Sequence, residues 1–329
     1  MSKTIEVIRE KAKSLNKHIV LPEGEEQRII DAAVTADGMK LAKVTLLGDE
    51  NVIRAKAKKL PASVGIINPK TAKETKEYAK LLFELRKDKG MTVEQADELA
   101  KNPLYFASLM VKSGKADGVV AGSVTATSDV LRPALQIIKT AKGVAAVSSF
   151  FLMVLPEGSA FGHNGALIYA DCGVIIDPTV EQLAAIAIAS AKSGKDILGM
   201  DPKVAMLSFS TKGSAKHARA DKVIEATKLA KQLSPDLQID GELQGDAALV
   251  ESVGRQKSPG SPVAGKANVL VFPDLDSGNI AYKLTQRLAN AEAYGPICQG
   301  FSQPVNDLSR GCTADDVVSV IAITCLQAK

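Results

Sequence analysis

Short runs of β-branched and other apolar residues alternate with longer helix-like patterns along most of the chain. Parallel strands need a crossover connection, which is usually an α-helix. The alternation therefore predicts an α/β protein with parallel-sheet-rich α/β domains and helices on both faces of each sheet. The expected strands are residues 18–21, 43–47, 64–68, 118–121, 145–155, 166–170, 204–209, 238–242 and 268–272. The expected helices are residues 25–38, 49–60, 71–89, 128–139, 179–193, 219–233, 244–256 and 277–292.

Two places break this rhythm. Residues 92–113 contain two more helical segments with no strand between them. Near Lys142 and Gly143 a turn ends one α/β set, and the long apolar run 145–155 begins another. The glycines spaced over residues 158–165 then predict a hairpin, the least parallel-looking part of the chain. We therefore expect a domain boundary near Lys142.

Composition excludes several classes of partner. The chain of 329 residues is 46% hydrophobic, which is enough for a sizeable core and argues against global disorder. Its 41 Lys and Arg barely exceed its 37 Asp and Glu, and aromatic residues make up only 4%. Neither a basic surface nor base-stacking platforms are indicated, so we expect no nucleic-acid partner. Anionic partners would have to be bound by a few well-placed arginines.

The chain has the pattern of a cytoplasmic protein. Its charged N-terminal segment lacks the apolar core of a signal peptide. The longest apolar runs, residues 183–191 and 317–325, are too short to cross a bilayer, so we expect no membrane association. The four cysteines lie far apart with no C-x-x-C pair, which indicates reduced, buried thiols and neither a disulfide framework nor a zinc site.

The segment 304–316 carries the densest set of reactive groups. It places Ser309, Arg310, Gly311 and Asp316 directly before an apolar element, with Thr313 in position to cap a helix. Asp316 stands where the third residue of a capping box would stand. A helix that begins here directs backbone N–H groups at the Ser-Arg-Gly turn, which predicts an anion site with an arginine beside it and a carboxylate at its edge. These are the groups of an acyl- or phosphoryl-transfer site.

A second turn also predicts an anion site. Residues 118–121 are an expected buried strand, and a Gly/Ser/Thr-rich turn follows at residues 122–128. The helix after it carries Arg132 in its first turns, so Ser128 and Arg132 are the expected donors. In open α/β sheets ligands bind beyond the carboxyl ends of strands. The alternative is an ordinary capped helix.

Other candidate motifs point away from nucleotide-hydrolysing and metal chemistry. Residues 260–267 resemble the sequence motif of a phosphate-binding loop. However, Ala267 stands where the motif has a metal-binding hydroxyl, and Pro262 lacks the backbone N–H that would bind phosphate. The segment is also followed by an expected strand, whereas the motif is followed by a helix. The three histidines stand alone. Acidic residues, among them Glu242 and Asp274, stand at the ends of two expected strands. We expect them to cap the helices that follow, although metal binding is an alternative. We expect no metal.

The sequence as a whole resembles the phosphate acetyltransferase (phosphotransacetylase) family. The residues that carry the resemblance are the C-terminal run 304–312, together with runs 21–25, 128–133 and 276–279, and the likeness extends in order over essentially the whole chain. The C-terminal run is specific. Runs 21–25 and 128–133 also occur in phosphate butyryltransferases and in the C-terminal domains of some malic enzymes.

The resemblance implies an architecture like that of isocitrate and isopropylmalate dehydrogenases, with two α/β domains flanking a cleft. It places residues 1–142 and 300–329 in the first domain and residues 143–299 in the second. It implies a homodimer without a permanently bound cofactor. The implied reaction is reversible acetyl transfer between acetyl phosphate and coenzyme A, which gives acetyl-CoA and phosphate; coenzyme A is then a substrate.

The resemblance also assigns roles to residues. It implies that Asp316 accepts the proton of the CoA thiol, that Arg310 holds the phosphate, and that Ser309 donates a hydrogen bond in the transition state. It assigns Arg86, Arg132 and Arg287 to substrate or CoA binding, although Lys87 beside Arg86 is an alternative for that position.

Three readings remain beside acetyl transfer. A phosphate butyryltransferase would differ only in the acyl pocket, which no single residue reveals. A non-catalytic module would bind acetyl-CoA without turning it over. A metal- and NAD(P)-dependent hydroxyacid dehydrogenase of the same architecture would need clustered carboxylates. Within the acetyl-transfer reading, Cys312 leaves an acetyl-enzyme route open, but direct transfer in a ternary complex is the simpler route because the CoA thiol is itself a nucleophile.

Overall fold

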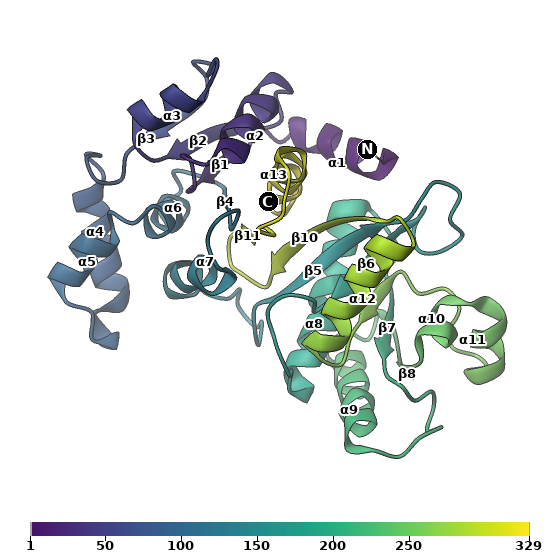
Figure 1. The fold of residues 1–329 in the computed structure, drawn as a ribbon. Coiled ribbons are helices and arrows are strands. Elements are labelled where there is room, and N and C mark those ends of the chain that lie inside the picture. Colours follow the sequence, from purple (N-terminus) through teal and green to yellow (C-terminus); the bar gives the residue numbers. More distant parts are fainter. Residues whose placement is uncertain (1, 329) are drawn as a thin grey trace. The chain divides into compact units, whose positions relative to one another are not determined.

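The computed structural model describes residues 2–328. These residues form two compact units, and each contains one sheet with helices around it (Figure 1). The first unit consists of Ile5–Lys142 and the chain from Phe301 onward. The second unit consists of Gly143–Gly300 and the residues before Ile5. The chain therefore leaves the first unit once and returns to it for its last strand and helix.

The first unit contains a five-stranded sheet in the order β11-β4-β1-β2-β3 within the described chain. Every neighbouring pair in it is parallel. Its strands are β1 (His18–Leu21), β2 (Lys43–Leu47), β3 (Gly65–Ile67), β4 (Gly118–Ala121) and β11 (Val305–Asp307). Its helices are α1 (Lys3–Lys13), α2 (Gln27–Gly38), α3 (Glu50–Lys56), α4 (Thr75–Arg86), η1 (Lys87–Lys89), α5 (Val93–Leu99), α6 (Pro103–Lys112), α7 (Thr127–Pro133), η2 (Ala134–Ile138) and α13 (Ala314–Gln327).

Helices cover both faces of this sheet. Helices α2 and α13 pack on each other and on the central strands β1, β2 and β4. On the opposite face α6 packs on β4 and, with η2 and α4, encloses a core that includes Phe106 and Tyr78, whose rings meet edge to face at 4.9 Å. Helix α13 is buried along nearly its whole length, which explains why its sequence is apolar all round.

The second unit contains a six-stranded sheet in the order β10-β5-β6-β9-β7-β8 within residues 2–328. Strands β6, β9, β7 and β8 are mutually parallel, whereas β5 runs antiparallel between β6 and β10. The strands are β5 (Ser148–Val154), β6 (Ala166–Ala170), β7 (Lys203–Leu207), β8 (Gln238–Leu243), β9 (Val269–Val271) and β10 (Glu292–Gln299). The helices are α8 (Val180–Ser193), η3 (Gly194–Leu198), α9 (Ala218–Leu233), α10 (Gly245–Leu249), α11 (Glu251–Lys257) and α12 (Leu275–Leu288).

Helices also cover both faces of the second sheet. Helices α8 and α9 pack together on one face, and α10 and α12 pack on the other. The core under α12 includes Phe151 and Tyr282, whose rings stack at 3.8 Å. Helix α8 begins at a capping box in which Thr179 Oγ1 accepts a hydrogen bond from the Gln182 N–H and Gln182 Oε1 accepts one from the Thr179 N–H.

The expected fold class is confirmed: two largely parallel α/β sheets with helices on both faces. The hairpin expected after residue 155 is the antiparallel pair β5 and β6. The segments within 92–113 are the helices α5 and α6, with no strand between them in the described chain.

Two strands were not predicted, β10 and β11. The single helix expected over 244–256 is wrong, because Val250 adopts extended backbone angles and separates α10 from α11. The helix expected over 128–139 begins as α7 and continues as the π-helical turn η2 after Pro133.

All four cysteines, Cys172, Cys298, Cys312 and Cys325, are buried and free, as predicted from their wide spacing in the sequence. Among residues 2–328, no helix combines the length and apolar character needed to cross a membrane.

Candidate functional site

The candidate site lies at the carboxyl ends of three adjacent strands of the first sheet. Strands β11, β4 and β1 are neighbours and parallel, so the loops that follow them meet at one edge. The chain after β1 passes through α2 to β2 on one side, whereas the chain after β4 returns at β11 on the other side. Such a divergence of connections is where open α/β sheets bind ligands.

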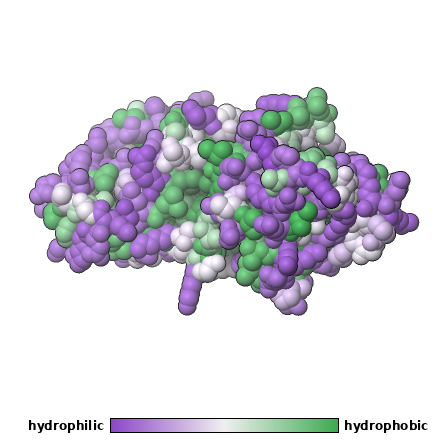
Figure 2. Space-filling view, turned by 90° about the horizontal axis from the view of Figure 1, so that it is seen from below, coloured by the Kyte–Doolittle hydropathy of each residue, from purple (hydrophilic) through white to green (hydrophobic). Residues whose placement is uncertain are grey.

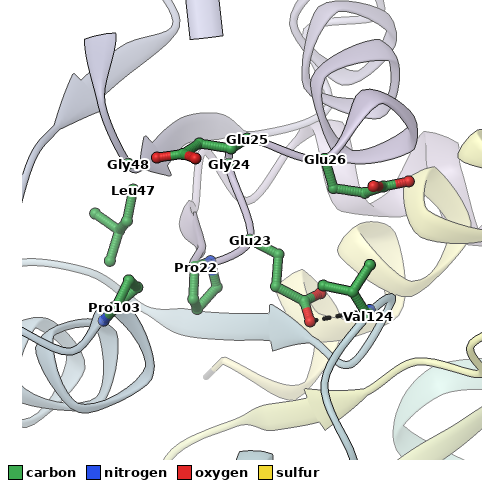
Figure 3. Close-up of a pocket in the computed structure, with 9 residues that line it drawn as sticks. All are labelled: Pro22, Glu23, Gly24, Glu25, Glu26, Leu47, Gly48, Pro103 and Val124. Carbon is green, nitrogen blue, oxygen red and sulfur yellow. Dashed lines mark hydrogen bonds between the residues drawn. The ribbon is translucent and has the colours of Figure 1, made fainter. Parts of the chain in front are cut away.

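A cavity of about 370 Å³ opens at this point (Figure 3). It is lined by Pro22, Glu23, Gly24, Glu25, Glu26, Leu47, Gly48, Pro103 and Val124. The lining residues come from the loops after β1, β2 and β4 and from the start of α6.

The turn after β4 binds an anion, and that anion is the carboxylate of Glu23. The Glu23 side chain points toward this turn (Figure 3). Its oxygens accept hydrogen bonds from the N–H groups of Gly122, Ser123, Val124 and Thr125 at 2.7–3.1 Å and from Ser123 Oγ at 2.6 Å. Burial raises the pKa of Glu23, but these hydrogen bonds outweigh it and hold the pKa below its ordinary value.

The backbone donors of this turn are therefore used by the protein's own carboxylate, and anion binding by Ser128 and Arg132 stays a prediction. The donors expected there do not face this carboxylate. Ser128 is exposed on the first turn of α7, and the exposed Arg132 pairs with Asp129 at 3.1 Å.

Arg28, at the start of α2, joins the three loops of the site. One of its terminal nitrogens, Nη1, donates to the carbonyl oxygens of Arg310 at 2.8 Å and Cys312 at 3.0 Å, in the loop after β11. The other, Nη2, donates to the Ser123 carbonyl oxygen at 3.0 Å, in the turn after β4. Its Nε donates to Glu26 at 2.7 Å, in the loop after β1. A single guanidinium thus fixes three segments that are distant in sequence.

The loop after β11 carries Ser309 and Arg310 at the surface. Both side chains are exposed. The loop is a tight turn in which the Cys312 N–H donates to the Ser309 carbonyl oxygen at 2.9 Å and the Gly311 N–H donates to Ser309 Oγ at 3.3 Å. The N–H groups of Gly311 and Cys312 are thus used within the turn.

Asp316 is held at the start of α13. Thr313 Oγ1 accepts from the Asp316 N–H at 3.2 Å, and Asp316 Oδ2 accepts from both the N–H and the hydroxyl of Thr313 at 2.8 Å. The expected capping box is confirmed. It orients a half-buried carboxylate within the same short loop as Ser309 and Arg310.

The next turn of α13 is held to α1. The buried Arg9 donates through Nη2 to Asp315 Oδ1 and to Ser319 Oγ, both at 2.8 Å. Asp315, which adjoins Asp316, is therefore tied to a side chain that is only 2% exposed. These hydrogen bonds hold the first turn of α13 in place, and this turn carries Asp316.

Asp307, at the end of β11, is a titratable group that the sequence analysis missed. Its side chain is 1% exposed, and Thr127 Oγ1 donates to its Oδ2 at 2.5 Å. Its Oδ1 is buried and has no hydrogen-bond partner within the described chain. Burial raises the pKa of Asp307 to about 6; the nearby Glu23 adds to the rise and Arg310 opposes it. The signal in the sequence was a carboxylate between Asn306 and Leu308, two residues before Ser309.

Cys312 lies beneath the loop after β11 and is only 7% exposed. Burial raises the pKa of its thiol, although the positive charge of Arg28 opposes the rise. A thiol with a raised pKa is less ionised near neutral pH and is therefore a weaker nucleophile.

The remaining predicted arginines fall into two groups. Arg86, at the end of α4, is half-buried, and its Nε lacks a hydrogen-bond partner among the described residues. Burial raises the pKa of Tyr105, and the positive charges of Arg132 and Arg86 both oppose that rise, so the two arginines lie near the same phenol. Arg287 is exposed near the end of α12, in the second unit.

The carboxylates at the strand ends of the second unit accept hydrogen bonds from neighbouring segments of the chain. Asp274 caps α12 by accepting from the Ser277 N–H at 2.9 Å, as expected. Glu242 accepts from Ser210 Oγ at 2.8 Å and from the Gly213 N–H at 2.7 Å. Within residues 2–328, no group of three or more His, Cys, Asp or Glu side chains is arranged to hold a metal ion.

Comparison with known proteins agrees with this arrangement. Residues 3–325 match the family described as phosphate acetyl/butaryl transferase. The chain is 55% identical over 326 residues to the phosphate acetyltransferase of Acetivibrio thermocellus, covering 99% of this chain and 98% of the relative. The crystal structure of a phosphotransacetylase from Streptococcus pyogenes superposes with a TM-score of 0.93 at 45% identity, over 100% of this chain and 99% of that one.

A more distant likeness concerns the fold alone. The 4-hydroxythreonine-4-phosphate dehydrogenase from Klebsiella pneumoniae superposes with a TM-score of 0.52 at 11% identity, over 94% of this chain and 98% of that one. A dehydrogenase architecture was expected, and this likeness supports it. Because the family match extends over residues 3–325 and the relative from Acetivibrio thermocellus is 55% identical, the chain belongs to the phosphate acetyl/butyryl transferase family.

Proposed function

We propose that the chain is a phosphate acetyltransferase that moves an acetyl group reversibly between acetyl phosphate and coenzyme A. The observation that carries the proposal is the segment from the end of β11 to the first turn of α13, which places Ser309, Arg310 and Asp316 at the carboxyl edge of the first sheet. The names of the relatives, phosphate acetyltransferase at 55% identity, support the same activity.

In the proposed reaction the CoA sulfur attacks the acetyl carbonyl carbon while its proton passes to Asp316. The carbon–sulfur bond forms, the bond between the acetyl carbon and the phosphate oxygen breaks, and phosphate leaves. Arg310 suits the phosphate because a guanidinium is always charged and can bind two phosphate oxygens at once. Ser309 Oγ is the proposed donor to the oxyanion that develops on the carbonyl.

Proton transfer in this scheme accompanies carbon–sulfur bond formation. A free thiol has a pKa near 8.5 and a free aspartate near 3.9, so complete transfer before attack would cost roughly 6 kcal/mol. Asp316 Oδ2 already accepts two hydrogen bonds from Thr313, which leaves Oδ1 as the proposed proton acceptor. The arginines around the site favour the thiolate that forms as the bond is made.

We propose direct transfer in a ternary complex rather than an acetyl-Cys312 intermediate. Burial and the raised pKa of Cys312 support this choice. Cys312→Ala is then expected to keep kcat within about fivefold of the parent, measured as acetyl-CoA formation from acetyl phosphate. If the variant folds normally by circular dichroism but its activity falls to background, the covalent route replaces the direct one.

CoA binding is proposed to use Arg86, Arg132 and Arg287. The half-buried Arg86 with its unpartnered Nε, and the closeness of Arg86 and Arg132 to Tyr105, support a shared anion-binding role for the first two. Arg287 is included because it is exposed and the family pattern assigns it.

We further propose a homodimer, as in the expected family pattern. On α12 the side chains of Ile280, Leu284 and Leu288 are 56%, 51% and 82% exposed, and their spacing of four residues places them on one helix face. Apolar side chains also reach the surface in the space-filling view (Figure 2). An exposed apolar stripe of this kind favours association. Light scattering on the purified protein measures the oligomeric state.

The decisive test is a set of initial rates with acetyl, propionyl and butyryl phosphate, with CoA, in the presence and absence of EDTA. Acetyl phosphate should give the highest kcat/KM, and EDTA should leave it unchanged. A preference for butyryl phosphate would support the butyryl-specific alternative. Binding of acetyl-CoA without turnover would support the non-catalytic module.

A further inference from the structure

The second sheet has its own divergence of connections, in a part of the chain that the proposed chemistry does not use. Strands β9 and β7 are parallel neighbours. The chain after β7 passes through α9 to β8 on one side, whereas the chain after β9 passes through α12 to β10 on the other side. The carboxyl ends of β7 and β9 therefore form a topological switch point, the position at which open α/β sheets bind ligands.

A cavity of about 540 Å³ lies at this switch point, inside the second unit. Its size falls in the range of sites for small organic ligands. We call it the β7/β9 cavity. Its lining residues are Asp177, Leu207, Ser208, Phe209, Ala218, Arg219, Lys222, Gly245, Phe272, Pro273, Asp274 and Ser277.

One wall of the β7/β9 cavity is apolar and aromatic. It contains Leu207 and Phe209 after β7 and Phe272 and Pro273 after β9. Phe209 is 55% exposed, which is unusual for so large an apolar side chain. Its ring meets His217 edge to face, with centroids 6.0 Å apart and planes at 70°, so its orientation is defined. An exposed, oriented ring beside a cavity is a surface on which a planar ligand ring can stack.

Other lining residues of the β7/β9 cavity carry charges of both signs. Arg219 and Lys222 lie in the first turns of α9, where the partial positive charge of a helix N-terminus favours an anion. Lys222 Nζ donates to Asp177 at 2.6 Å and to the Pro273 carbonyl oxygen at 3.0 Å. Arg219 pairs with Asp274 at 3.7 Å, and 74% of the arginine side chain is exposed.

The charged residues indicate which chemical groups a ligand of the β7/β9 cavity would carry. An ion pair as long and exposed as Arg219–Asp274 is weak, so the guanidinium can turn to a phosphate. The carboxylates of Asp177 and Asp274 can accept hydrogen bonds from hydroxyl or amine groups of the same ligand. The ligand is therefore expected to combine a planar ring, hydroxyl groups and a phosphate.

We propose that the β7/β9 cavity binds a purine nucleotide. The base stacks on Phe209, the phosphate lies against Arg219 and Lys222 at the start of α9, and the ribose hydroxyl groups donate to Asp177 or Asp274. Two sources would supply this chemistry: a free nucleotide, and the nucleotide end of coenzyme A. The second source rests on the proposed function, whereas the first does not.

Titration calorimetry with the full chain tests the site without any turnover. ADP and AMP should bind, and adenosine or inorganic phosphate alone should bind at least about tenfold more weakly, because each lacks half of the recognised groups. Phe209→Ala and Arg219→Gln should each weaken ADP binding by about tenfold or more. Phe209 and Arg219 are exposed, so neither substitution removes core packing.

Lys228→Gln is the matched control. It removes one cation from the exposed face of the same helix, outside the cavity lining, and should leave ADP binding unchanged. Two results would overturn the proposal: no detectable binding of ADP at millimolar concentration, or binding that Phe209→Ala and Arg219→Gln leave intact.

Calorimetry with CoA then identifies the source. If Phe209→Ala weakens CoA binding by about tenfold and ADP competes with CoA, the cavity holds the nucleotide end of CoA. If Phe209→Ala weakens ADP binding but leaves CoA binding within about twofold, the cavity is a separate site for a free nucleotide. Both results measure binding alone, so a chain without acetyltransferase activity would still give a clear answer.

Discussion

At the scale of single residues, the carboxylates of Asp307 and Asp316, on either side of the loop between β11 and α13, differ in environment. Asp307 is buried at the end of β11, with one oxygen bonded to Thr127 and the other without a partner in the described chain. Asp316 is half-buried at the start of α13 and bonded to Thr313. Asp307 is therefore closed to solvent, whereas Asp316 is the more accessible of the two carboxylates.

Replacing Asp316 by Asn separates proton transfer from binding. The amide keeps one oxygen to accept from Thr313 but cannot take a proton from the CoA thiol. We expect kcat to fall by about 10²–10⁴, the usual contribution of a general base, with little change in KM for acetyl phosphate. Steady-state kinetics at saturating CoA measure both. An effect on KM alone would exclude Asp316 from proton transfer.

Thr313→Ala is the control for the capping role of Asp316. It removes the hydroxyl from the capping box but keeps the carboxylate, so it should cost about 1 kcal/mol of stability. Its kcat should stay within about tenfold of the parent. A loss of kcat as large as that of Asp316→Asn would mean that orientation of the helix start, and not the base, limits the rate.

The raised pKa of Asp307 makes stability depend on pH. Its pKa is about 6 in the folded protein and near 3.9 in an unfolded chain, so the folded state binds the proton more tightly. Above pH 6 the buried charge destabilises the fold by about 3 kcal/mol; as pH falls from 6 to 4 this penalty disappears. Asp307→Asn should thus be more stable than the parent at pH 8, with the difference shrinking toward zero at pH 4.

Urea unfolding at several pH values measures this difference. Asp97→Asn, at an exposed position of the same unit, serves as the control and should differ from the parent by the same small amount at every pH. If the difference between Asp307→Asn and the parent did not change between pH 8 and pH 4, the buried carboxyl would not titrate in that range.

At the scale of elements, the turn after β4 depends on a glycine. Gly122 has a φ of +112°, and a Cβ at this position would lie 2.1 Å from Asp307 Oδ1. The close approach allows the N–H groups of Gly122 and Ser123 to reach Glu23, which holds the loops after β1 and β4 together. This contact was not predictable from local sequence, because Glu23 and Gly122 are brought together only by the pairing of β1 with β4.

Gly122→Ala should therefore lower the free energy of unfolding by about 2–4 kcal/mol through backbone strain and the clash with Asp307. Gly38→Ala is the matched control in the same unit. Gly38 ends α2, has no positive φ, and a Cβ there meets no atom of the described chain within 4 Å. The control should be unchanged or more stable by up to about 1 kcal/mol. Equal stability of the two variants would contradict the proposed packing of the turn.

The elements that the sequence predicted correctly are those with a strong local pattern. Strands β1, β2, β4 and β6 are short runs dominated by apolar residues, and their observed bounds match the expected ones. Strand β10 was missed because Gly295 and Pro296 lie inside it; as an edge strand it tolerates a proline, and its register shifts there. Strand β11 was missed because it is only three residues long and contains Asn306 and Asp307.

The residues of the candidate site also fall into those that the sequence predicted and those that it did not. Ser309, Arg310 and Asp316 were predictable because they lie within eight residues of one another and precede an apolar helix. Glu23, Arg28 and Asp307 were not assigned roles, because they lie far apart in the sequence: Glu23 and Arg28 follow β1, whereas Asp307 ends β11. Their proximity is a property of strand order, which helix and strand patterns do not specify.

At the scale of the whole molecule, the second unit is an insertion between two parts of the first. The chain leaves the first unit at Lys142 and re-enters it at Phe301. The two ends of the first unit lie close together, because Thr140 pairs with Phe301 in an isolated antiparallel bridge and the Ser302 N–H donates to the Lys139 carbonyl oxygen at 3.0 Å. Each unit also has a hydrophobic core of its own. These features favour two independently folding domains.

Two shortened chains test that proposal. Residues 143–300 alone should unfold in one cooperative thermal transition, followed by circular dichroism. Residues 5–142 joined to 301–328 by a short Gly-Ser linker should do the same, because the linker needs to span only the gap closed by Thr140 and Phe301.

Residues 5–142 without the C-terminal segment provide the control. This chain lacks β11, which pairs with β4, and α13, whose buried side chains from Val317 to Leu326 cover β1, β4 and α2. The apolar surface left on β1 and β4 would have no partner, so we expect aggregation or a non-cooperative transition. If this control folded as well as the linked chain, α13 would not belong to the core of the first unit. If the linked chain failed to fold while residues 143–300 folded, the first unit would depend on the second for its stability.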